Sequence, residues 1–577
     1  MRLFSSPLLF SLGFASFMLV MSYPASGQVS CKRLVLAKDL ADAARLNRYR
    51  IATTNNASLN GLSASDFQVA VRWAADSWNN QGAGGHFQYI GTTASDALPP
   101  AQGSCGSPCD LNKVIVVVGF ANGPNDPPNV LGQVTPLCNS GVSMKFECWA
   151  LRIFTHRRDA LGVVTENEWF SGQREYGKFD IVGILTHEFG HTLNLGHPES
   201  DTNLTMHAVM RAGADAAIGT TTWRDLYEYD TRCVTVQEGR REATPYRIAL
   251  ASGAFSTPLV FSSFSASTAS ASYSYKSGAW SSASAFRSQS CAAWSRPLTS
   301  GGGHECVGAN SLVVSPTAAL WREQPSRDRV TFVSHTEVPL GGQYAQRRVD
   351  MRYSDNDFVT EFSLSTSYCG IMSSGWFTCT TLQNLDSAFP LSTAWYDGNL
   401  GPNHPTGASV TAWAFQSRTS ETVNRSVRVS IGKISDGVVP TPTNVDVRAA
   451  SQPAVACKVG EAGPFDCLIA YASADTRDLA VKIKRFSPYV FGNRYSISIE
   501  AAEYGVPTAT ASRLALVHHN GYWYLAARSI DAYQNIKVYR SINGSTWALF
   551  ASALDYSLSG PSMPSWYTGN SVLVGLK

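Results

Sequence analysis

The feature that most restricts the fold of this chain is the spacing of three histidines in the segment 186–197, which reads THEFGHTLNLGH. His187 and His191 are four residues apart, so on a helix both imidazoles project from one face. His197 follows six residues after His191, and a continuing helix would carry it far along the axis. The chain must therefore turn back sharply near Asn194, a residue type that tolerates positive φ better than most.

The same spacing is that of metal ligands. Two imidazoles four residues apart on a helix can both reach one Zn²⁺ at about 2.0–2.1 Å, and His197 supplies a third nitrogen. Glu188 lies one step round the helix from His187, so it sits beside the metal, within reach of a metal-bound water. Three neutral imidazoles leave a fourth tetrahedral position for that water, which is the arrangement of a catalytic zinc.

The segment resembles the metzincin signature H-E-x-x-H-x-x-G-x-x-H, with Asn194 in the place of the family's glycine. The apolar lead-in DIVGILTHEFGH is most similar to the matrixin branch. The resemblance implies a mixed α+β zincin (metzincin-like) catalytic domain with one catalytic Zn²⁺. Glu188 would be the general base that activates the zinc-bound water for peptide hydrolysis. The ligands would be His187, His191 and His197.

The metzincin resemblance also implies a methionine turn beneath the zinc. The residues that end in Met210 (Ala208-Val209-Met210) resemble this turn, and Met206 is a competing candidate. The thioether would underlie the metal as a packing surface and not as a ligand. A closing helix is expected to carry Asp225 and Leu226. Calcium (Ca²⁺) is common in the family, and no residue can be assigned to it here.

A length of 577 residues is too great for one ordinary core and predicts two or three domains. Residues 1–27 read as a signal peptide, with Arg2 before an apolar run and small residues before the cleavage point. We assign residues 28–245 to the metzincin-like domain and 246–577 to an all-β domain. No later segment is long and apolar enough to span a bilayer, so a secreted, extracellular protein is expected.

The charge of the chain excludes some classes of partner. The net charge is +3, close to neutral for this length, and no run of Lys and Arg occurs. We therefore expect neither nucleic acid nor an acidic membrane surface as a partner. A low charged fraction of 15% with many Gly and aromatic residues suits β-rich extracellular domains. The expected partners are a protein or peptide substrate and a glycan or protein ligand of the β domain.

All twelve cysteines follow the signal peptide, and an even number in a secreted chain indicates disulfides. Three pairs share a spacing of ten residues, and each would staple a hairpin: Cys138/Cys148, Cys369/Cys379 and Cys457/Cys467. Two further pairs are close in sequence: Cys105/Cys109 and Cys291/Cys306. For the remaining Cys31 and Cys233, a disulfide is favoured over a role of Cys31 in blocking the zinc.

The N-terminal half shows mixed helix and strand patterns. Helices are predicted over Phe67–Trp78, from an N-cap at Asp180 onward, and over Trp223–Tyr229. The apolar run Val114–Phe120 predicts a buried strand. The segment Asn129–Val134 is a candidate edge strand, against which an extended peptide would lie.

The C-terminal half repeats a unit of two strands. Three such units recur every 56 residues: TAWAFQS with SVRVSIG, CLIAYAS with LAVKIKRF, and WYLAARS with IKVYRSI. A weaker copy lies further upstream and consists of VTFVSHT with RRVDMRYS. The segment 541–547, SINGSTW, resembles the Asp-box turn of sialidase-like propellers. A fixed period of this kind predicts a β-propeller of about five or six blades, with a pair of β-sandwiches as the rival fold.

The leading functional prediction is a secreted zinc endopeptidase whose β domain binds a substrate or partner. The alternative is an adhesin or lectin in which binding by the β-propeller is primary and the zinc domain is auxiliary. A sialidase-like glycosidase would need a cluster of arginines around an anion, and Arg428 and Arg540 are better explained as charges on strand surfaces.

Overall fold

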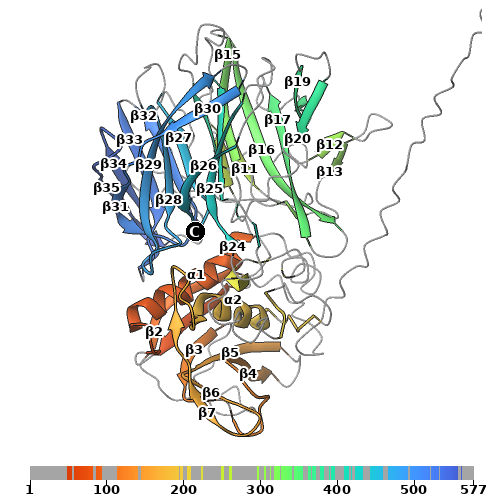
Figure 1. Cartoon of the computed structure of the whole chain (residues 1–577), viewed down its shortest axis with the longest axis vertical. Helices are drawn as coiled ribbons and strands as arrows, with labels where there is room; N and C mark the ends of the chain where they lie inside the picture. The colour runs from red at the N-terminus through yellow and green to blue at the C-terminus, as the bar shows by residue number, and fades with distance from the viewer. Residues whose placement is uncertain are drawn as a thin grey trace, which may run out of the picture.

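The computed structural model describes most of residues 48–198, short stretches between 205 and 230, the strands between 248 and 381, and most of residues 389–561. The predicted signal peptide lies outside the described residues. The N-terminal part combines helices with a sheet, whereas all the described elements from Ile248 onward are strands. In Figure 1 the helices α1 and α2 lie between the N-terminal sheet and the β-rich sheets. No helix in the described parts is long and apolar enough to cross a membrane.

The N-terminal part is built on a five-stranded sheet of order β2-β1-β3-β5-β4. Strands β1, β2, β3 and β5 are parallel, and β4 runs antiparallel to β5 at the edge. The predicted apolar strand is β3, at the centre, and the candidate edge strand begins three residues later than its predicted start, at Gly132. The bounds are β1 Arg48–Thr54, β2 His86–Thr93, β3 Lys113–Gly119, β4 Gly132–Ser140 and β5 Lys145–Phe154.

Two small sheets follow β5. The strands β6 (His156–Arg158) and β7 (Val164–Glu166) form an antiparallel hairpin. The strands β8 (Trp169–Phe170) and β9 (Phe179–Asp180) pair in parallel and lead directly into helix α2.

Helix α1 (Ala64–Gln81) begins with a reciprocal cap. The Ser63 side chain accepts from the Asp66 backbone N–H at 3.1 Å, and the Asp66 carboxylate accepts from the Ser63 N–H at 3.3 Å. One face of α1 packs on helix α2, where the Trp78 indole N–H donates to the Thr186 carbonyl at 2.8 Å. Helix α1 therefore touches α2 at the residue that precedes His187.

Helix α2 (Ile181–Thr192) starts after Asp180, whose carboxylate accepts from the Val182 N–H at 3.2 Å, as the sequence predicts. Every residue of α2 is buried. A helix with apolar residues on all sides is stable only inside a core, and α2 lies against α1, β4 and β5.

The predicted helix over Trp223–Tyr229 is wrong in its first part. Thr222–Arg224 form a 3₁₀ helix (η1), and Leu226 belongs to no regular element. Asp225 lies outside the described residues. Short 3₁₀ turns often connect elements, and here one presents Trp223 and Arg224 to helix α2.

The β-rich part contains several antiparallel sheets. Its strands are β10 Ile248–Ala251, β11 Leu259–Ser262, β12 Ser295–Pro297, β13 His304–Cys306, β14 Leu312–Val313, β15 Thr317–Gln324, β16 Arg327–Leu340, β17 Tyr344–Ser354, β18 Phe362–Leu364, β19 Ser367–Ile371, β20 Phe377–Thr381, β21 Ser392–Tyr396, β22 Ala408–Ala414, β23 Ser417–Arg418, β24 Val423–Asn424, β25 Ser426–Gly432, β26 Thr443–Arg448, β27 Ala454–Cys457, β28 Cys467–Ala472, β29 Ala480–Phe491, β30 Arg494–Ile499, β31 Tyr504–Ala509, β32 Leu514–His519, β33 Tyr522–Arg528, β34 Asn535–Ser541 and β35 Ala548–Tyr556.

Three consecutive sheets carry the repeat. Their orders are β21-β22-β25-β26, β27-β28-β29-β30 and β32-β33-β34-β35, so each repeated strand pair forms the two middle strands of a sheet. The weaker copy pairs as β16 and β17. Contacts run between the edge strands of successive sheets, from β10 to β15, β21, β27 and β32. The predicted all-β region and its strand pairs are thus confirmed.

The middle one of these sheets is buried on both faces. Alternate residues of β28 enter two different cores: Leu468 and Ala470 face the sheet that contains Trp523, whereas Ile469 and Tyr471 face the sheet that contains Val429. A strand covered on both sides reads as a continuous apolar run, which explains the segment CLIAYA.

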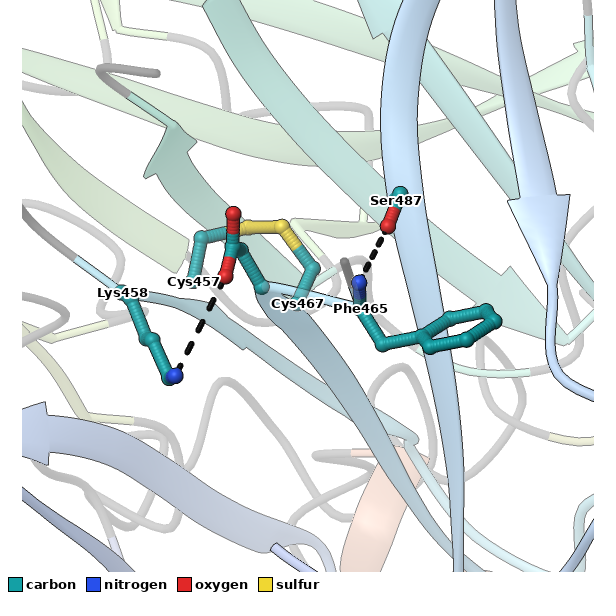
Figure 2. Close-up of a disulfide and its surroundings, with 6 residues drawn as sticks. Cys457, Lys458, Phe465, Cys467 and Ser487 are labelled. Atoms are coloured by element: carbon teal, nitrogen blue, oxygen red, sulfur yellow. Dashed lines mark hydrogen bonds and ion pairs between the residues drawn. A yellow bond between two sulfur atoms is a disulfide. The ribbon is translucent and has the colours of Figure 1, made fainter. Parts of the chain in front are cut away.

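The cysteine pairs with a spacing of ten lie in hairpins. Cys457 and Cys467 form a disulfide between β27 and β28, which Figure 2 shows beside the Lys458–Asp466 contact and the hydrogen bond from the Phe465 N–H to Ser487. In the two other pairs, Cys138/Cys148 and Cys369/Cys379, the two cysteines also lie opposite each other on paired antiparallel strands. The side chains of these two pairs, and the remaining predicted disulfides, lie outside the described structure.

Candidate metal centre

Three histidines from two segments meet at one point. His187 and His191 project from α2, and His197 follows the end of that helix. One ligand nitrogen from each lies within 4.8 Å of the others, and the Nε2 atoms of His187 and His197 are 3.2 Å apart. Among the described residues this is the one group of three or more potential metal ligands. The predicted histidine cluster is therefore brought together by the fold.

Backbone carbonyls fix the tautomers of the two helical histidines. His187 Nδ1 donates to the Thr205 carbonyl at 2.6 Å, and His191 Nδ1 donates to the Leu195 carbonyl at 2.7 Å. Each Nδ1 therefore carries the proton, which leaves Nε2 with a free lone pair. Burial, followed by the nearby His197, lowers the pKa of His191 to about 3. Burial and the other histidines also lower the pKa of His187 well below its usual value.

These residues fit a zinc ion. Neutral imidazoles are the form that binds a metal, and both buried rings are held in that form. Tetrahedral ligands at about 2.0–2.1 Å from Zn²⁺ are separated from one another by roughly 3.3 Å, close to the 3.2 Å between His187 and His197. The donor set of nitrogen atoms is also one that zinc accepts.

Glu188 lies beside the histidines in a dry environment. The residue is 5% exposed, and none of the described residues donates a hydrogen bond to its Oε2. Burial raises the pKa of Glu188 to about 8. The neighbouring edge strand leaves room for this carboxylate, because a Cβ added at Gly132 would lie 2.7 Å from Glu188 Oε1. A buried carboxylate with an oxygen that no described residue satisfies is typical of a functional group and not of a structural one.

Two hydrogen bonds close the end of helix α2, before the chain reaches His197. The Leu195 N–H donates to the Gly190 carbonyl at 3.1 Å, and Leu193 N–H donates to the same carbonyl at 3.0 Å. A bond across five residues at a helix end is characteristic of the Schellman motif. Asn194, between these two leucines, lies outside the described residues, so its predicted left-handed conformation stays a prediction.

Met206 lies next to the site, whereas Met210 lies outside the described residues. Met206 is fully buried and follows Thr205, the residue whose carbonyl orients His187. A Cβ at Gly190 would lie 2.2 Å from Met206 Sδ, so the thioether packs directly on the backbone of α2 between the two histidines. The methionine turn predicted at Met210 is not tested by the described residues.

Several residues that contact the three histidines carry no signal in the sequence. Thr205 and Leu195 act through backbone carbonyls, which no residue type reveals. The sequence predicts Trp223 only as part of a helix, whereas its ring stacks on His187 with centroids 4.6 Å apart. Gly132 gave no signal other than its place in the candidate edge strand.

A separate groove of about 490 Å³ lies at the carboxyl ends of the parallel strands. Its lining includes Val117 and Arg152, whereas the alternate residues Val116 and Leu151 belong to the core. Because alternate residues of a strand point to opposite faces, the groove and helix α2 lie on opposite faces of the sheet. The groove is therefore not the site formed by the histidines.

No protein-family profile matches the chain, and no curated protein matches it. Among solved structures, a fucose-specific lectin from Aleuria aurantia is similar at 13% identity over 46% of this chain and 71% of the lectin, with a TM-score of 0.29. A Trypanosoma rangeli sialidase in complex with sialic acid is similar at 11% identity and a TM-score of 0.20. That match covers 44% of this chain and only 40% of the sialidase. Similarity at these TM-scores supports no conclusion about function.

Proposed function

We propose that this protein is a secreted zinc-dependent endopeptidase with its active site at His187, Glu188, His191 and His197. The observation that carries the proposal is the combination of three converging imidazoles, two of them held neutral with the proton on Nδ1, and a buried carboxylate whose Oε2 accepts no hydrogen bond from the described residues. A structural zinc site would have four protein ligands and no need for such a carboxylate.

The roles of the residues follow from their places. Zinc, when bound, supplies a Lewis acid that lowers the pKa of water and polarises a carbonyl oxygen. Glu188 takes a proton from the attacking water and passes it to the leaving amine. The protonated form of Glu188 is favoured by burial alone, and a cation held by the neighbouring histidines would favour the carboxylate. The base would thus be available in the metal-loaded protein.

The substrate would bind as an extended segment along strand β4. This strand lies at the edge of the described sheet, so one side of its backbone is not paired within that sheet. An extended peptide can add to such an edge through main-chain hydrogen bonds. Gly132 at the start of β4 lies against Glu188, which would bring a peptide on this edge close to the general base.

The β-rich part would be a β-propeller that binds a substrate or partner. Antiparallel sheets of four or five strands in sequence order, joined through their edge strands, support this arrangement. The turn 541–547 supports it further: Asn543 accepts from the Ser545 and Thr546 N–H groups, and the Trp547 indole N–H donates to the Gly544 carbonyl. Arg540 is exposed and packs over the Tyr522 and Phe550 rings, as expected for a charge on a strand surface.

The proposal is tested with the purified full-length mature chain. We expect about one zinc per chain and hydrolysis of casein or gelatin that a zinc chelator abolishes and added zinc restores. Glu188→Gln should keep the zinc content and melting temperature but lose activity by a factor of about 10² to 10⁴, because only the proton transfer is removed. Glu166→Gln, at an exposed position, is the matched control.

Two outcomes would decide against this function. Loss of zinc together with activity in Glu188→Gln would make Glu188 a ligand and not a base. Glycan binding that survives chelation, without any proteolysis, would favour the alternative in which the β-rich part is a lectin or adhesin and the zinc site is auxiliary.

A further inference from the structure

Residues Thr222–Arg224 (η1) lie directly on the helix that carries the metal ligands. The Trp223 ring stacks almost parallel to the His187 imidazole, with an interplanar angle of 13° and centroids 4.6 Å apart. Trp223 is 5% exposed, so this contact is inside the core. On helix α2, Gly183 makes room for it, because a Cβ there would lie 3.1 Å from Trp223 Cβ.

We propose that Trp223 is a positioning residue that holds the His187 imidazole in the orientation needed to bind the metal. The inference rests on the proposed zinc site and adds a residue to it. The hydrogen bond to the Thr205 carbonyl sets the direction of His187 Nδ1 within the ring plane. The stacking of Trp223 sets that plane itself. The two contacts together leave Nε2 one direction to point.

Arg224 anchors the tryptophan. Its guanidinium donates to both oxygens of Asp180 at 2.7 Å, and its third hydrogen bond goes to the Gly172 carbonyl at 2.8 Å. Both partners of this ion pair are buried, and bidentate geometry is the strongest form of the interaction. Because Asp180 is also the N-cap of α2, the segment η1 is fixed to the start of the helix whose later turn carries His187.

The orientation of the His187 ring also affects the other two histidines, because both of their rings contact it. His197 also lies parallel to His187, with an interplanar angle of 27°, while His191 is perpendicular to it. A tilt of the His187 ring would change its distance to both neighbours. Such supporting contacts are known to alter metal affinity about 10-fold to 100-fold when they are removed.

The test compares Trp223→Leu with Trp223→Phe in the full-length chain. Trp223→Leu should weaken Zn²⁺ binding about 10-fold to 100-fold, measured by competition with a chromophoric chelator, and should alter the visible absorption of the Co²⁺-loaded protein. Trp223→Phe keeps an aromatic ring and should be much less affected. Trp169→Leu is the control, since Trp169 is fully buried in the same core and its ring contacts Phe179 at a tilt of 51°.

A second comparison separates positioning from general stability. In a His187→Ala background, where the weaker site retains His191 and His197, Trp223→Leu should cause no further loss of affinity, because its target is already gone. An equal loss in both backgrounds, or unchanged affinity in Trp223→Leu, would overturn the inference. A wild-type protein that binds no zinc would overturn the proposed function as well.

Discussion

At the scale of single residues, the three histidines differ in how the fold supports them. His187 and His191 are buried and hydrogen-bonded to backbone carbonyls, whereas His197 is exposed. The position of His197 therefore depends more on the backbone that carries it than on packing around its ring. In the described part of that backbone, the hydrogen bond from the Leu195 N–H to the Gly190 carbonyl closes the end of helix α2.

Asn194 gives a prediction at this scale. If it adopts the left-handed conformation typical of the position after a helix end, Asn194→Gly should be tolerated, because glycine takes positive φ without a Cβ penalty. Asn194→Val should lower zinc occupancy, because a β-branched residue is strained there and the turn would carry His197 away from the metal. Zinc content after dialysis measures the difference. Equal zinc content in the Gly and Val variants would show that the chain does not turn at this residue.

At the scale of elements, helix α2 and strand β4 form the site together. Small residues make the contact close: Gly190 lets Met206 pack on the helix, and Gly132 lets Glu188 lie against the strand. The two glycines differ in what an added side chain would meet. A side chain at Gly190 would meet Met206 Sδ and the Trp78 ring in the core, whereas one at Gly132 would meet only the Glu188 side chain, from Cγ to Oε1.

Gly132→Ala should therefore separate catalysis from folding. The new Cβ would lie 2.7 Å from Glu188 Oε1, so the carboxylate has to move, although the backbone does not. We expect unchanged zinc content and melting temperature with a loss of kcat on the order of 10²-fold, because a base displaced by about 1 Å is badly aligned. Gly505→Ala, a strand position with open space around it, is the control. Full activity in Gly132→Ala would mean that the observed position of Glu188 is not the catalytic one.

At the scale of the whole molecule, the two parts share a core. Buried residues of the β-rich part, among them Ala472 and Leu479, belong to the same apolar cluster as helices α1 and α2. Polar contacts cross the same interface: Asp76 of α1 forms a buried ion pair with Arg528, and Arg477 pairs with Glu175 at 2.8 Å. The β-rich part is thus bound to the helix that packs on α2.

The buried pair gives a prediction for the stability of the whole chain. Arg528→Met should destabilise the protein by about 3–5 kcal/mol, because Asp76 would remain as a buried charge without its partner. Adding Asp76→Asn should recover part of this loss. The more exposed pair is the control, and Arg477→Met should cost roughly 0–1 kcal/mol. Denaturant unfolding measures both, and equal effects of the two single variants would argue against a shared core at α1.

The sequence by itself determined the histidine cluster, the helix from Asp180, the central strand β3 and the repeated strand pairs. Each of these rests on local rules: a spacing that matches the helical period, a capping residue, or an apolar run with a fixed repeat. The spacing, the capping residue and the apolar run each lie within a few neighbouring residues, and the repeat returns the same short pattern every 56 residues. They therefore predict elements and ligand spacing without knowledge of the fold.

Only the tertiary structure decided what surrounds these elements. The carbonyls of Thr205 and Leu195 orient two of the histidines. Trp223, which the sequence places in a helix, stacks on His187. Gly132 makes room for Glu188. The pairing of Asp76 with Arg528 joins residues 452 positions apart. Backbone groups and contacts over such distances carry no signature in residue type or period, because they depend on how whole elements pack. The same packing removes water from Glu188 and so sets its pKa.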